Sequence, residues 1–409
     1  MNSGNNTLWD RFVNWASKPK VYTALWVLVC FAASIAKCAP KLHNNFLIFR
    51  ASFWHLVQQQ NLYVPYPAEY NDLFLYGPPF TLLIAPFAVL PEIVGLFAWN
   101  IALGAILYGA ILVLEREHTK RAFIFFVSAH ELLLALFMQQ FNVAICALLI
   151  LCFVAIRNQK EGWAAFFLVL GTITKVYGIV GLAFFPLITR KKKFIGHSLF
   201  WAILLLLAPA LISSTSYVVE QYHNWIGVLP AKNEANMFSL AQNISLLGIV
   251  RKITHSPNYS DLWIITPMVS LLGLALLRRS CYKITQYQML LLAQVLLYVV
   301  ILSSGSESSG YITAMVGIAI WFMYSRKVVP NKLLTGLLVA AIILTSFSHS
   351  DLMPAYLQNT WIKPYALKAL VPSVIALLNG IYLLRYPFLQ QESNPKTQEK
   401  EVDTIANKS

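Results

Sequence analysis

Long apolar stretches recur along most of this chain, and they constrain its fold more than any motif does. The 409 residues are 58% hydrophobic and only 12% charged, with a mean hydropathy of +0.61. A soluble domain carries charge on about a quarter of its residues, whereas a helix that crosses a bilayer needs about 20 mostly apolar ones. The composition therefore predicts an all-α, polytopic integral membrane protein and argues against a water-soluble fold.

The apolar stretches predict about 12 transmembrane helices, including one short broken pair. The pair, 163–174 and 177–189, is interrupted by Lys175 and Gly178, and each half is too short to cross a bilayer alone. The other predicted spans are 21–39, 92–114, 122–138, 141–156, 194–212, 262–277, 285–302, 310–325, 333–348 and 366–384. No repeat of fixed period is present, so residues 1–389 are predicted to be one membrane domain. The polar tail 390–409 is predicted to be disordered and cytoplasmic.

The basic residues predict the orientation of the chain. Placing both termini in the cytoplasm puts 22 of the 31 Lys and Arg inside, leaves eight outside, and leaves Lys175 within the membrane. Basic residues gather on the cytoplasmic side of membrane proteins, so the net charge of +14 indicates topology and not nucleic-acid binding. A basic N-terminal arm precedes an apolar run that has no small-residue cleavage site, as in an uncleaved signal anchor. We expect a multi-pass protein of the bacterial inner (plasma) membrane.

Three sizeable segments, 40–91, 213–261 and 349–365, are then outside the cytoplasm, and we expect the active face there, towards the periplasm. In the first, 46–63 places apolar residues on one helical face, which is typical of an amphipathic helix lying along the membrane surface. Prolines then interrupt a second apolar stretch of only about a dozen residues, too short to cross. We expect this stretch to enter the outer leaflet and return.

With the spans placed in this way, Lys175 is the only Lys or Arg deep inside an apolar stretch. A charge at that depth must be paired or must face a polar cavity. We expect an outer-facing cavity at the junction of the broken pair, and a structural ion pair between helices is the alternative. His130 and Glu131 lie inside another span, where hydrogen bonds between helices are favoured. Neither the five cysteines nor the histidines have metal-ligand spacing, so no metal, disulfide or cofactor site is predicted.

Several motifs, in a fixed order, resemble glycosyltransferase family 87. They are Asn45-Phe46, Asn61-Leu62-Tyr63, Tyr76-Gly77-Pro78-Pro79-Phe80, the stretch Pro86 to Pro91, Gln140-Phe141-Asn142, Thr174-Lys175-Val176-Tyr177, Gln242-Asn243-Ile244-Ser245-Leu246 and Arg251. The resemblance covers most of residues 20–325. It implies a GT-C-like membrane fold and a mannosyltransferase-like hexosyltransferase. Such an enzyme takes its sugar from a polyprenyl phosphate, passes it to a lipid-linked or cell-envelope glycan, and inverts the anomeric centre.

Transfer from a lipid phosphate needs positive charge for the departing phosphate and a base for the acceptor hydroxyl. The cations predicted to bind the donor phosphate are Lys175, Arg50 and Arg251. For the two arginines the alternative is a side chain that reaches the lipid headgroups. The residues predicted to bind substrate are Asn44, Asn45, Tyr76, Gln140, Asn142, Tyr177, Asn243 and Ser245.

The expected base is missing from its usual position. The family usually has an acidic residue just before the aromatic position matched by Phe46, whereas this chain has Asn44 and Asn45 there. Asparagine can orient a sugar hydroxyl but cannot take its proton. Either another carboxylate has taken the role or the activity is altered. The candidates are Asp72, which is the best placed, then Glu69, and Glu307 in the short loop 303–310, which could instead bind sugar or pair with Lys175.

Two other functions are open at this point. A transporter or lipid-carrier flippase would also need broken helices and an intramembrane charge, but no matching pair of interrupted helices appears in the other half of the chain. A catalytically altered glycan-assembly protein is favoured by Asn44 and Asn45. The expected partners are the lipid-linked donor, the glycan acceptor and membrane lipids.

Overall fold

The computed structural model of the protein describes residues 7–39, 42–256, 258–326 and 328–392. Every regular element in these ranges is helical, which confirms the all-α prediction. Five helices are long and apolar enough to cross a membrane: Pro19–Lys37, Glu92–Leu114, Lys191–Leu211, Asn331–His349 and Leu367–Arg385. The membrane character is therefore supported, and the number of about 12 spans and the GT-C-like arrangement stay predictions. From residue 393 on, the tail predicted to be disordered lies outside the described residues.

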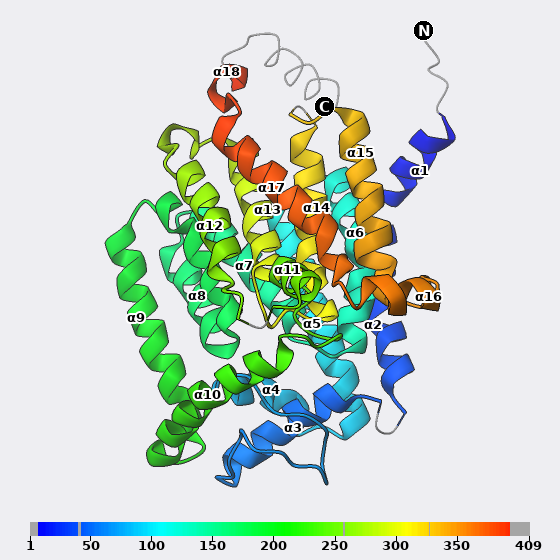
Figure 1. The fold of residues 1–409 in the computed structure, drawn as a ribbon. Helices are drawn as coiled ribbons and strands as arrows, with labels where there is room; N and C mark the ends of the chain where they lie inside the picture. The colour runs from blue at the N-terminus through cyan, green and yellow to red at the C-terminus, as the bar shows by residue number, and fades with distance from the viewer. Residues whose placement is uncertain (1–6, 40–41, 257, 327, 393–409) are drawn as a thin grey trace.

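The described ends of the chain lie on one side of the molecule, and the first loop region lies on the other. Figure 1 shows α1 (Leu8–Ala16) and α18 (Phe388–Glu392) at one end. At the opposite end are α3 (Asn44–Val57), α4 (Phe80–Ala88) and α10 (Thr215–Asn236). The helix expected over 46–63 ends earlier than predicted, because Gln59 adopts a left-handed backbone (φ 55°) and the amide of Gln60 bonds back to the carbonyl of His55.

Three helices form the interior of the bundle, with nearly every side chain buried. They are α7 (Asn142–Arg157), α13 (Thr285–Ile301) and α14 (Tyr311–Ser325). The helices packed around them include α5 (Glu92–Leu114), α6 (His118–Phe137), α12 (Leu262–Leu276) and α17 (Leu370–Arg385), and α2 (Pro19–Lys37) packs against α5 and α6. By contrast, α9 (Lys191–Leu207) exposes large apolar side chains such as Leu199 and Phe200. Such an exposed apolar face is typical of a helix that contacts lipid.

The remaining elements are short or connect the bundle helices. They are α11 (Leu246–Thr254), α15 (Asn331–Ala340), α16 (Ala355–Leu357), the 3₁₀ segments η2 (Ala208–Leu211), η3 (Arg279–Cys281), η4 (Ser308–Gly310), η6 (Phe347–His349) and η8 (Leu367–Ala369), and the π segments η5 (Ala341–Ser346) and η7 (Gln358–Ile362).

The predicted broken pair is a tight helical hairpin with Lys175 at its tip. Its arms are α8 (Glu161–Thr174) and the 3₁₀ segment η1 (Val176–Leu187). Arg190, just after the second arm, is 2.7 Å from the carboxylate of Glu161 at the start of the first, so the arms run antiparallel. A Cβ on Gly178 would lie 2.2 Å from the Gly171 backbone, so only glycine allows the arms to approach so closely.

Lys175 is not the only Lys or Arg that the described structure places in the protein interior. Lys368, in η8, is fully buried, and its Nζ lies 2.7 Å from Oε1 of Glu131, also fully buried, on α6. From the sequence, Lys368 was expected on the outer side because it begins a span, where a lysine usually reaches the polar boundary. Here it points inward, because Glu131 offers a partner that offsets the cost of burial. The helix-to-helix bonding expected of His130 and Glu131 is confirmed, since His130 Nδ1 is 2.9 Å from Ser346 Oγ.

Candidate active site

A cavity of about 310 Å³ lies where the first loop region, the tip of the α8–η1 hairpin, α10 and the loop between α13 and α14 meet. Residues far apart in the sequence converge on it. The predicted site residues that line it are Asn45, Asp72, Tyr76, Gln140, Lys175, Tyr177 and Glu307. The structure thus brings seven of the predicted residues to one place, and their chemical roles stay predictions.

Tyr76 reaches the hairpin tip because the next residue is glycine. The amide of Gly77 donates to the carbonyl of Thr174 (3.0 Å), and a Cβ at Gly77 would lie only 2.0 Å from the carbonyl oxygen of Ile173. Trp225 of α10 donates to the carbonyl of Leu75 (3.0 Å), which holds the loop from its other side. The close approach of two backbones, which only glycine permits, fixes the Tyr76 ring beside Lys175.

Lys175 is bound only by neutral groups. Its Nζ donates to Oδ1 of Asn142 (2.9 Å) and to the hydroxyl of Tyr76 (3.3 Å), and it lies 5.1 and 5.2 Å from the centres of the Tyr76 and Tyr177 rings. None of the ion pairs between described residues includes Lys175. Aromatic faces and amide oxygens stabilise an ammonium group without neutralising it. Glu307 lines the same cavity and acts on Lys175 electrostatically from beyond ion-pair distance, so Lys175 presents a positive charge to the cavity without a direct ion pair.

A row of hydrogen bonds connects Lys175 to both ends of the site. On one side, the hydroxyl of Tyr76 donates to Oε1 of Gln140 (2.8 Å). On the other, Nδ2 of Asn142 donates to Oγ of Ser309 (3.0 Å), which donates to Oε2 of Glu307 (3.4 Å). Asn142 is not among the residues that line this cavity, and it holds Lys175 from outside that lining. Glu307 and Lys175 form no direct ion pair: the two charges interact through space, and the neutral side chains of Ser309 and Asn142 connect them.

Asp72 lies at the exposed edge of the cavity and is already paired. Its oxygens are 3.0 and 3.3 Å from Nζ of Lys232 on α10, and about half of its side chain is exposed. Its backbone is left-handed (φ 78°), and the amide of Leu73 donates to Oδ1 (2.8 Å). Asp72 keeps lone pairs that an acceptor hydroxyl could use, and release of Lys232 would free more of them.

The two asparagines at the usual acidic position do different things. Asn44 pairs with the backbone of Asn71, donating to its carbonyl (2.7 Å) and accepting from its amide (2.8 Å), and does not line the cavity. Asn45 donates to the carbonyl of Met138 (2.8 Å) and does line the cavity. A carboxylate cannot make either donation, so the local fold makes use of the amide groups.

Several other predicted residues are not brought to the cavity. Glu69 lies 3.1 Å from Nε2 of the buried His55, and Arg50 of α3 is also not among the lining residues. Arg251 is nearly buried and lies 2.7 Å from Oδ1 of Asp261. The structure therefore gives Glu69 and Arg251 local partners away from the cavity, and of the three predicted phosphate-binding cations it brings only Lys175 there.

Asn243 and Ser245 also lie away from the cavity and shape a turn. Oγ of Ser245 donates to Oδ1 of Asn243 (2.9 Å) and accepts from the amide of Gly248 (3.0 Å), which caps α11. The amide of Ile244 donates to the carbonyl of Ser306 (2.9 Å) and so attaches this turn to the loop that carries Glu307. Gln242, in the same motif, does line the cavity.

The contribution of α10 to the cavity was not predicted from the sequence. Four of its residues, at i, i+3, i+4 and i+7, line the cavity: Leu229, Lys232, Asn233 and Asn236. This spacing puts them on one face of a helix, and it could have been found by testing the second outer segment for helical periodicity. Ser303 and Ser304 were also missed, although the loop that contains them had been singled out for Glu307.

The model of glycosyltransferase family 87 matches residues 74–346, which is more than half of the chain. The chain belongs to glycosyltransferase family 87. A comparison with curated proteins finds no match. The matched range contains Tyr76, Lys175 and Glu307, whereas Asn45 and Asp72 precede it. Membership of this family indicates a glycosyltransferase, and the apolar helices indicate a membrane protein. The cavity contains residues of the matched range and residues of the loop before it.

Proposed function

We propose that this family 87 protein transfers a hexose from a polyprenyl-phosphate donor to a lipid-linked or cell-envelope glycan on the outer face of the bacterial inner membrane. The observation that carries the proposal is Lys175, a cavity-lining ammonium group that is held by Asn142 and Tyr76 and forms no ion pair with any described residue. An intramembrane cation with neutral neighbours favours an anionic ligand. A lipid-linked phosphate supplies that anion and also a tail that the bilayer can hold.

In the proposed reaction, the acceptor oxygen attacks the anomeric carbon while the bond from that carbon to the donor phosphate oxygen breaks. The acceptor proton passes to a carboxylate, and the phosphate leaves with the bonding electron pair. Lys175 stabilises the negative charge that grows on this phosphate, a kind of stabilisation that usually dominates catalysis. A single displacement of this kind inverts the anomeric centre.

We propose Asp72 as the base and Lys232 as its regulator. Lys232 forms an ion pair with Asp72 in this structure, and the phosphate of an arriving donor would compete with Asp72 for this cation. Release would free a carboxylate oxygen for the acceptor hydroxyl. Glu307 is the comparison, because it lines the same cavity and is joined to Lys175 through Ser309 and Asn142.

The test is sugar transfer by the purified protein, with a radiolabelled polyprenyl-phosphate sugar and a membrane lipid extract as acceptor source. The proposal predicts label in the acceptor fraction and loss of that label in Asp72→Asn. Normal transfer in Asp72→Asn combined with loss in Glu307→Gln would assign the base to Glu307 instead.

A catalytically altered glycan-assembly protein is the second candidate, and Asn45 favours it because an amide lies in the cavity where the family usually has an acid. Such a protein would bind the labelled lipid without forming product. Movement of intact donor across a vesicle membrane without product would instead indicate a flippase.

A further inference from the structure

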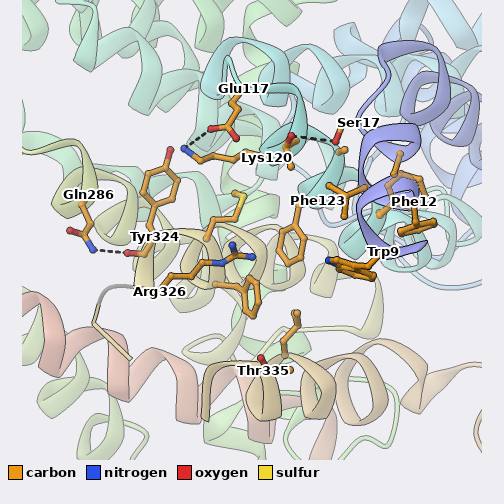
Figure 2. Close-up of a pocket in the computed structure, with 18 of the residues that line it drawn as sticks. Trp9, Phe12, Ser17, Glu117, Lys120, Phe123, Gln286, Tyr324, Arg326 and Thr335 are labelled. Atoms are coloured by element: carbon orange, nitrogen blue, oxygen red, sulfur yellow. Dashed lines mark hydrogen bonds and ion pairs between the residues drawn. The ribbon is translucent and has the colours of Figure 1, made fainter. Parts of the chain in front are cut away.

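A second and larger cavity, of about 1080 Å³, lies at the other end of the molecule, near the described N-terminal helix. It is bounded by α1, the first half of α6, the end of α14 and α15 (Figure 2). Its volume is at the upper limit of the roughly 300–1,000 Å³ pockets that hold drug-sized ligands. None of the residues of the candidate active site lines it, so it is a separate feature.

The lining of this cavity is divided into an apolar and a polar part. Figure 2 shows Trp9, Phe12 and Phe123 together on one side, and Glu117, Lys120 and Gln286 on the other. The side chains of Trp9 and Phe12 are 68% and 48% exposed, although both are aromatic. Exposed aromatic residues at the end of a membrane bundle are typical of contact with lipid at the interface. The cavity thus has the amphipathic character of a bilayer lipid.

The polar part carries a net positive charge. Lys120 is 3.0 Å from the carboxylate of Glu117, and its Nζ lies 5.2 Å from the centre of the Tyr324 ring. Arg326 contacts the Phe322 ring (5.1 Å from its centre), and no ion pair between described residues includes it. The cavity is lined by two cations, Lys120 and Arg326, and by one carboxylate, Glu117. Because Glu117 pairs with Lys120, no carboxylate of the lining is paired with Arg326. A planar guanidinium suits a phosphate, which it can bind through two parallel hydrogen bonds.

We propose that this cavity binds one anionic phospholipid of the leaflet on that side. The acyl chains lie against the aromatic side, and the phosphate lies between Arg326 and Lys120. Basic pockets between membrane helices on the cytoplasmic side favour anionic headgroups, and the basic residues of the sequence place this end in the cytoplasmic leaflet. The proposal does not depend on the reaction catalysed at the other end.

Native mass spectrometry of the full-length protein tests it, with phosphatidylglycerol and phosphatidylcholine of identical acyl chains added in equal amounts. We expect the wild type to retain one phosphatidylglycerol in preference to phosphatidylcholine. In the variant Lys120→Ala/Arg326→Ala, the ratio of bound phosphatidylglycerol to bound phosphatidylcholine should fall at least about fivefold. This is the effect expected from the loss of one basic residue near a membrane surface. The matched control Lys192→Ala/Lys193→Ala removes the same charge from exposed residues of α9 outside the cavity and should keep the preference.

Equal retention of the two lipids by the wild type overturns the proposal, and so does an equal loss in the control variant. Recovery of the protein as a lipid-independent dimer would assign the surface to a second copy. If the double variant does not fold, Arg326→Gln replaces it. A second readout is quenching of Trp9 by brominated phosphatidylglycerol, measured as the difference between the wild type and Trp9→Phe. No difference in quenching would exclude lipid from the cavity.

Discussion

Replacing Lys175 by methionine should abolish sugar transfer and leave the protein folded. The structure gives the reason, because the ammonium group has only neutral partners, Asn142 and Tyr76. Its removal leaves one amide oxygen short of a donor, at a cost of about 1–3 kcal/mol in the free energy of unfolding. Loss of a preorganised charge that stabilises the departing phosphate should lower kcat by about 10²–10³-fold or more. Lys175→Arg should restore activity only in part, because guanidinium and ammonium differ in shape and reach.

Lys368→Met is the matched control, since it makes the same chemical change at a fully buried lysine away from the cavity. It would leave the carboxyl group of Glu131 fully buried without its partner, which should cost about 3–5 kcal/mol. Thermal unfolding in detergent and radiolabel transfer, measured on both variants, give the comparison. We expect Lys175→Met to lose transfer with a small change in unfolding temperature, and Lys368→Met to show a much larger fall in that temperature. Full transfer by Lys175→Met, or equal destabilisation of the two variants, would refute the reasoning.

Three further predictions address the base, the loop and the topology. Asp72→Asn should lower turnover by about a hundredfold or more with little change in donor binding, and unchanged turnover would remove it as the base. Gly77→Ala should lower both transfer and unfolding temperature, because its Cβ meets a hairpin carbonyl at 2.0 Å, whereas Gly227→Ala, which has open space, should change neither. A cysteine introduced at Lys192 should be shielded from impermeant thiol reagents in intact cells while one at Asn233 is labelled, and the reverse labelling would contradict an outer active site.

Much of the architecture could be predicted, because the composition indicates the membrane class and the lengths of the apolar runs indicate the helices. The hairpin around Lys175 was visible in the sequence as two runs too short to span, and the structure shows it as α8 and η1. The convergence of Tyr76, Gln140 and Asn142 on Lys175 was suggested only by the resemblance to a family. Nothing in their spacing alone predicts the hydrogen bonds that join them.

The predictions that differ from the structure share one physical cause: tertiary packing decides which partner a charged side chain meets. Arg251 is basic and lies in an outer segment, yet Asp261, ten residues on, pairs with it away from the cavity. Lys368 begins a span, yet it turns inward to Glu131, which is more than 200 residues away in the chain. Lys232 was not predicted as a site residue, because its role depends on the tertiary packing that brings α10 to the cavity and Lys232 into contact with Asp72.

The most direct test of the central claim is the fate of the sugar in proteoliposomes that contain only the purified protein, a radiolabelled polyprenyl-phosphate sugar and the glycolipid fraction of the membrane. The account predicts that label leaves the polyprenyl phosphate and appears, with inverted anomeric configuration, in the glycolipid product of the wild type but not in that of Lys175→Met. Label that stays on the polyprenyl phosphate in the wild type, or that reaches product equally in both proteins, would contradict it.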